Sequence, residues 1–129
     1  MMNAPTLDEA LTECLSIMET LRDYVVRTES YSVVHFPDPM QRLAAIRESS
    51  RLTGRLTSVL SWLLWHKAAL NGEITREELE KNTAEVMDDA PKAAQATDTA
   101  NLPDDLQGLR DRSEELFIRI SRLQGLVDG

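Results

Sequence analysis

The stretch LPDDLQGLRDRSEELFIRISRLQGLV, residues 102–127, carries the clearest structural pattern of this sequence. Steps of four and three residues alternate along a single series: Leu102, Leu106, Leu109, Ser113, Leu116, Ile120, Leu123 and Val127. Residues at this spacing form one continuous seam along an α-helix. Pro103 followed by two aspartates is typical of a helix start, because proline loses no hydrogen bond there and carboxylates favour the positive end of the helix dipole. The pattern predicts a helix over residues 103–127. We expect five residues of its seam to face the second predicted helix: Leu106, Leu109, Leu116, Ile120 and Leu123.

A first helix is predicted over residues 7–28. Thr6 and Glu9 form a capping-box pattern, in which each side chain satisfies a free amide at the helix start. Apolar residues then recur on one face: Leu7, Leu11, Cys14, Met18, Leu21 and Val25. Cys14, the one cysteine, falls within this stripe, so we expect a small buried hydrophobic residue rather than a reactive thiol.

The second helix is predicted over residues 39–70 and is the longest. Residues 28–37 combine hydroxyl residues, two valines and a proline, which favours a loop. Asp38 and Pro39 supply an N-cap and a first-turn proline, and Asn71 with Gly72 supplies the stop. A helix of this length is about 48 Å long at the usual rise per residue, which is enough to span the whole bundle.

A short helix is predicted over residues 75–87, because Thr75 and Glu78 form a second capping box. Residues 88–101 contain no large apolar side chain and predict a flexible surface linker. The expected fold is therefore all-α, a single domain over residues 1–129. We expect an up-down-up three-helix bundle with a short extra helix after the second long helix.

The charge balance restricts the partners. The chain has 14 basic and 22 acidic residues and a net charge of −8, which argues against nucleic acid and against anionic lipid surfaces. The N-terminus lacks the basic start and apolar run of a secretion signal, and the apolar run over residues 59–65 is too short to span a membrane. With one cysteine there is also no disulfide pair within the chain, so we expect a cytoplasmic protein.

The residues offer little for catalysis or for a cofactor. His35 and His66 have no second ligand at metal-binding spacing, and the sequence has no phosphate-binding glycine loop or nucleophile motif. The heptad stripes offer few inward polar groups, so a ligand site in the bundle core is disfavoured. The sequence predicts no metal, no cofactor and no enzymatic activity.

The most distinctive apolar segment is LTSVLSWLLWHKAAL, in which large side chains point in nearly every direction around the helix. Such a helix needs cover on more than one side. Either the short helix supplies this cover, or a second chain does. Tryptophan is enriched at binding hot spots, so the candidate protein-binding residues are Trp62, Leu63, Trp65 and His66. We expect a homodimer whose contact includes at least one of the two tryptophans, together with Leu63 or His66.

Arg47, Arg51 and Arg55 recur at steps of four on the same helix and are further candidates for protein binding. The interpretation that we favour is pairing with acidic groups of the first helix such as Glu13, Glu19 or Asp23. The alternative is a cationic ridge that docks an acidic partner.

The segment RLTGRLTSVLSWLL, residues 51–64, followed by the turn Gly72-Glu73-Ile74-Thr75, resembles the signature of the RcdA-like family of alphaproteobacterial proteins. The likeness in element order and length covers about residues 7–82. The resemblance implies a three-helix bundle that forms homodimers. It also implies an adaptor that helps the ClpXP protease degrade cell-cycle regulators such as CtrA.

Two functional hypotheses follow. The first is a non-enzymatic adaptor or regulator of ClpXP-type proteolysis in bacterial cell-cycle control, which holds ClpX and a client together and so raises their effective concentration. The alternative is a structural dimeric helical bundle, in which the same apolar helix forms a permanent interface.

Overall fold

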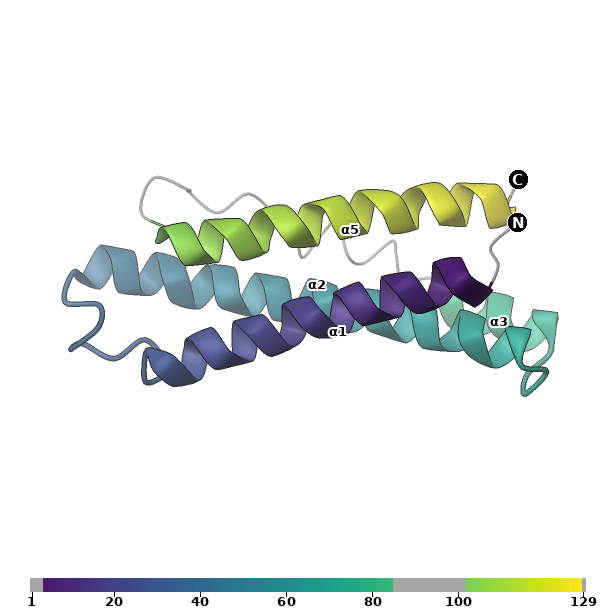
Figure 1. Ribbon diagram of the computed structural model, residues 1–129, viewed down its shortest axis with the longest axis horizontal. Coiled ribbons are helices and arrows are strands. Elements are labelled where there is room, and N and C mark those ends of the chain that lie inside the picture. The colour runs from purple at the N-terminus through teal and green to yellow at the C-terminus, as the bar shows by residue number, and fades with distance from the viewer. Residues whose placement is uncertain (1–3, 85–101, 129) are drawn as a thin grey trace.

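The computed structural model describes residues 4–84 and 102–128, with side chains for residues 5–84 and 102–124. Within these ranges all regular structure is helical (Figure 1). The helices are α1 (Ala4–Arg27), α2 (Pro39–Leu70), α3 (Arg76–Thr83) and α5 (Asp104–Asp128). The expected all-α class is therefore confirmed.

Local capping signals explain most of the helix bounds. The Asp38 carboxylate accepts a hydrogen bond from the Met40 amide at 3.0 Å, and α2 ends before Gly72, whose φ is +76°. Both ends of α2 lie at the predicted residues. The start of α1 was predicted wrongly, because this helix begins at Ala4 with Pro5 in its first turn, so Thr6 is not the N-cap.

The predicted cap of the short helix is confirmed. The Glu78 amide donates to Thr75 Oγ1 at 3.1 Å, and the Thr75 amide donates to Glu78 Oε1 at 3.4 Å. This helix, α3, ends at Thr83, short of the predicted residue 87. Residues 85–87 and the predicted linker over residues 88–101 lie outside the described residues.

The three long helices surround one apolar core, and α3 packs against the C-terminal part of α2. The predicted seam of α5 is confirmed, since four of its five principal residues are buried and the fifth is partly buried against the core: Leu106, Leu109, Leu116, Ile120 and Leu123. The opposing core residues of α1 and α2 include Leu7, Cys14, Ile17, Leu52, Leu56 and Val59.

The direction of α5 differs from the prediction. Arg27 near the end of α1 pairs with Asp105 at the start of α5, at 3.3 Å, so these two helices are antiparallel. Arg55 near the middle of α2 pairs with Glu114 near the middle of α5, and Figure 1 shows both helices running in the same direction. The up-down-up order is therefore wrong for the last helix, which runs parallel to α2.

The length of the connection accounts for this error. Twenty residues separate Thr83 from Asp104, and an extended chain of that length spans up to about 65 Å. Such a connection can return to the other end of the bundle, whereas a short loop would have forced α5 to run antiparallel to α2.

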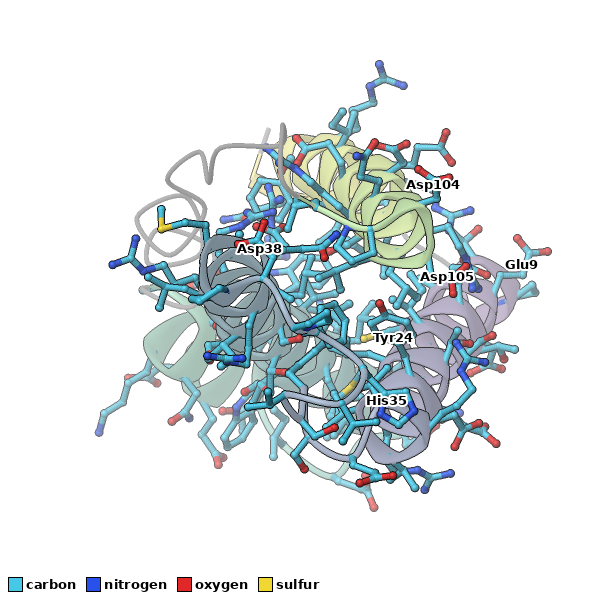
Figure 2. The ribbon with its side chains drawn as sticks, turned by 90° about the vertical axis from the view of Figure 1, so that its left-hand side faces the viewer. Glu9, Tyr24, His35, Asp38, Asp104 and Asp105 are labelled. Carbon is cyan, nitrogen blue, oxygen red and sulfur yellow. The ribbon has the colours of Figure 1, made fainter. Side chains whose placement is uncertain are left out.

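The loop between α1 and α2 is closed by aromatic residues, at the end of the bundle that faces the viewer in Figure 2. The Tyr31 ring lies edge-on to Tyr24 at 5.9 Å and to Phe36 at 5.2 Å between ring centres. The Tyr31 hydroxyl hydrogen-bonds Ser49 of α2. This anchor holds three successive residues with positive φ, namely Glu29, Ser30 and Tyr31.

Candidate protein-binding surface

Most of the predicted tryptophan cluster lies inside the bundle. Trp62 is 1 % exposed and Leu63 is fully buried, and His66 is buried as well. The Trp62 and His66 rings lie against each other with 3.9 Å between their centres and an interplanar angle of 36°. These three residues form no surface patch, because α1, α3 and α5 all pack against α2.

The cover over Trp62 and His66 comes from the same chain. Both side chains line a hollow of about 340 Å³ together with Leu79 and Thr83 of α3 and Gln124 of α5. For this part of α2, the short helix supplies the cover that the sequence left open.

Trp65 is the exception among the predicted aromatic residues, because it is only half-buried. It lines a shallow apolar hollow on α2, together with Thr57, Leu60, Ser61 and Leu64. Leu64 is 52 % exposed. This side of α2 faces away from α5, whose contacts come through Glu48 and Arg55 on the opposite side.

A second apolar hollow of about 250 Å³ continues this surface into the groove between α1 and α2. Its lining residues are Met18, Leu21, Arg22, Val25, Val26, Thr53 and Leu56. Thr53 and Leu56 precede Thr57 and Leu60 by one helical turn, so the two hollows adjoin. We call this surface the outer face and define it by Val25 and Val26 of α1 and by Leu60, Leu64 and Trp65 of α2.

The outer face is almost free of charge. Between Arg47 and Lys67, α2 has three charged residues, namely Glu48, Arg51 and Arg55. None of them lies on the outer face, since Glu48 and Arg55 are buried and the Arg51 side chain is 8 % exposed. On the α1 side, Arg22 is paired with Glu19 at 4.0 Å and with Asp23 at 3.2 Å. Arg22 is the one charged residue that lines the two hollows, and in a chain with a net charge of −8 a surface with so little charge is a distinct feature.

The three predicted arginines do not form one exposed ridge. Arg51 Nε donates to both carboxylate oxygens of Glu48 at 3.1 Å, Arg55 pairs with Glu114 at 2.6 Å, and Arg47 is exposed. Successive steps of four residues turn by about 40° around an α-helix. The series therefore rotates from the exposed side of α2 at Arg47 to the buried side at Arg55.

The predicted pairing of these arginines with acidic residues of α1 is wrong. Glu13 of α1 instead accepts from Arg112 of α5 at 3.1 Å, and Glu19 pairs with Arg22 of its own helix. Glu48, which the sequence analysis did not single out, is the buried centre of this charge cluster, with Arg110 of α5 also 3.9 Å away. Its position on the inner side of α2 follows from helical spacing once the register of α5 is known.

Cys14 is a structural residue, as its place in the apolar stripe predicts. It is fully buried, and its thiol donates to the Leu56 carbonyl oxygen at 3.6 Å. Burial, with a smaller contribution from the neighbouring Glu13, raises the pKa of the thiol to about 11. The thiolate that a nucleophile or metal ligand requires is therefore suppressed at neutral pH.

The other residues considered for chemistry are dispersed. His35 lies in the exposed loop, with Nδ1 at 3.1 Å from Ser32 Oγ. Across residues 4–84 and the described part of α5, no three His, Cys, Asp or Glu side chains gather in a group that could hold a metal ion. None of the helices in the described ranges is both long and apolar enough to cross a bilayer.

Comparison with known proteins places the whole chain in one family. A family model described as a protein of unknown function, DUF1465, matches residues 1–128. No curated protein and no solved structure matches the chain. The extent of the family match shows that this chain belongs to the DUF1465 family.

Proposed function

We propose that this chain is a non-enzymatic protein-binding module that acts as an adaptor or regulator of ClpXP-type proteolysis in bacterial cell-cycle control. The observation that carries the proposal is the outer face, a largely apolar surface that no described helix covers. Apolar surface of this kind marks a site of protein contact. The resemblance of residues 51–64 to the RcdA-like family supports the choice of ClpX, a client regulator and the bacterial cytoplasm.

The first partner that we propose is a second copy of the chain. Two copies that each carry a charge of −8 repel one another. Contact through the outer face buries apolar groups and keeps most carboxylates in solvent, and an identical face on both copies suits a two-fold contact. Trp65 and Leu64 are then the central residues of the dimer contact, in place of Trp62 and Leu63.

Sedimentation equilibrium of Leu64→Asp tests the dimer. The introduced carboxylate would be desolvated in the contact, so we expect dimerisation to weaken at least tenfold. Ile118→Asp is the matched control, because Ile118 is also an exposed aliphatic residue, 42 % exposed, but lies on α5. A parent chain that is monomeric at micromolar concentration, or equal dimerisation of both variants, would contradict this contact.

Binding to purified ClpX tests the adaptor role. We expect the chain to bind ClpX and to accelerate degradation of a client such as CtrA by reconstituted ClpXP, through effective concentration alone. The alternative, a structural dimeric bundle, predicts a stable dimer that neither binds ClpX nor alters client degradation. A chain that binds ClpX and accelerates client degradation supports the adaptor, and a stable dimer that does neither supports the structural bundle.

A further inference from the structure

The helix α3 is held to the bundle by very few side chains. Six of its eight residues are exposed, and only Leu79, half-buried, and Thr83, buried, face inward. An isolated helix of eight residues is unstable in water. The helical state of α3 therefore depends on its docking against α2.

Within the described residues, the side chains of α3 hydrogen-bond to α3 itself and its cap rather than to α2. These hydrogen bonds join Arg76 to Glu80, Asn82 to the Glu78 carbonyl, Thr83 to the Leu79 carbonyl, and Thr75 with Glu78. The long helices differ in this respect, since α1 and α5 are joined by Arg112 and Glu13, and α2 and α5 by Arg55 and Glu114.

The docking surface is also incompletely filled. Trp62, His66, Leu79 and Thr83 line the hollow of about 340 Å³ beneath α3. The exposed Arg76 and Glu80 also line this hollow, so it opens to solvent, and the side chains beside it lack protein contacts on that side. At the near end of α3, the chain turns through Asn71 and Gly72, and the positive φ of this glycine, +76°, suits a hinge.

From these observations we propose that α3 is a flap that opens by local unfolding while α1, α2 and α5 remain packed. Opening exposes the rings of Trp62 and His66, which are 1 % and 8 % exposed when the flap is closed. The opening is a property of the free chain and does not depend on the proposed function.

Native-state hydrogen exchange of the full chain tests the flap. We expect the amides of residues 79–84 to exchange at least 100-fold faster than the core amides of α2, with little dependence on low concentrations of denaturant. Exchange of α3 at the same rate as α2, and only through global unfolding, would overturn the proposal. Because no partner is present, this result is independent of ClpX binding.

Two variants and a control assign the effect to the docking contacts. Leu79→Ala is expected to speed α3 exchange about tenfold further and to leave α2 protected, and Thr83→Leu, which fills the hollow, is expected to slow it. Lys81→Ala, at an exposed position of the same helix, should change neither rate. If Leu79→Ala speeds exchange equally in every helix, α3 is an inseparable part of the bundle and the flap does not exist.

Fluorescence quenching gives a second readout. Trp65→Phe leaves Trp62 as the single tryptophan, and its quenching by acrylamide reports access to the covered ring. We expect Leu79→Ala in this background to raise the quenching constant at least twofold while far-ultraviolet circular dichroism retains the helical signal of the three long helices. An unchanged quenching constant would show that opening α3 does not uncover Trp62, and would overturn this part of the proposal.

Discussion

Arg55 of α2 and Glu114 of α5 form the closest ion pair between the two parallel helices, with 2.6 Å between Nη1 and Oε2. The arginine side chain is 3 % exposed, and its guanidinium carbon lies 4.0 Å from the centre of the Phe117 ring. Glu114 is about half exposed. A buried cation is thus compensated by one carboxylate at the surface and by the face of an aromatic ring.

Removing this carboxylate should destabilise the fold. We expect Glu114→Gln to lower the free energy of unfolding by about 1–2 kcal/mol, because the buried guanidinium loses its charge partner. The carboxylate of Glu114 is half exposed and loses little hydration on folding, so its removal offsets little of this loss. Urea denaturation measures the change. Glu115→Gln, at a neighbouring exposed position, is the control, and equal effects of the two variants would contradict the assignment.

Glu48 should be more sensitive than Glu114. Its side chain is fully buried against Arg51, whose side chain is 8 % exposed, with Arg110 close by. We expect Glu48→Gln to cost about 3–5 kcal/mol, because it leaves buried positive charge without a carboxylate. Glu19→Gln removes an exposed ion pair with Arg22 and should cost less than about 1 kcal/mol in the same denaturation assay. Comparable losses would show that burial of Glu48 does not determine its contribution.

Substitution by glycine at a residue with positive φ in the α1–α2 loop should stabilise the fold. Ser30 is exposed and has a φ of +57°, a conformation that costs a residue with a Cβ about 1 kcal/mol. Ser30→Gly should therefore raise the free energy of unfolding by up to about 1 kcal/mol, measured by thermal or urea denaturation. Ser50→Gly, within α2, should lower it by a similar amount because glycine disfavours a helix. Destabilisation by both changes would argue against this loop conformation.

Cys14 should make the fold sensitive to alkali. Its pKa is raised to about 11, so above pH 9 the unfolded chain ionises its thiol while the folded chain does not. This contribution to stability is complete below pH 8 and is lost as the pH rises towards 11, by on the order of 2 kcal/mol. Burial also raises the pKa of Tyr24 and Tyr31, which adds to the loss in the same direction.

Comparison of unfolding free energies at pH 7 and pH 10 for the parent and for Cys14→Ala isolates the thiol. The variant should be less stable at pH 7, because it leaves a cavity, and should lose less stability on going to pH 10. Labelling of the parent thiol by a disulfide reagent at pH 8 should proceed only as fast as the chain opens. Immediate labelling would place the thiol at the surface.

The two tryptophans should separate folding from association. Trp62→Ala should lower the free energy of unfolding by about 3–5 kcal/mol, because it empties a core position. Trp65→Ala should leave folding nearly unchanged and weaken dimerisation by about 1–3 kcal/mol, because its half-exposed ring belongs to the outer face. Denaturation and sedimentation equilibrium measure the two quantities. These assignments would be reversed if Trp62→Ala weakened the dimer without lowering folding stability and Trp65→Ala changed neither quantity.

Features encoded within one or two helical turns were predictable from the sequence. The N-caps at Asp38 and Thr75, the stop at Gly72 and the seam from Leu106 to Ile120 are all where local spacing placed them. A cap needs only a side chain and an amide two or three residues away, and a seam needs only a repeat that matches the helical period. Cys14 was assigned to the core for the same reason.

Three features were decided by tertiary structure alone. The direction of α5 was open because twenty residues separate it from α3, and a heptad seam packs equally well in either direction. Trp62 and Trp65 have similar neighbours in the sequence, and the contacts of α2 with α3 and α5 made one a core residue and left the other on the outer face. The arginine series likewise acquired its partners Glu48 and Glu114 only when α5 docked beside α2. Each of these outcomes depends on which surfaces meet across the bundle, and helical periodicity defines the faces of a helix but not what covers them.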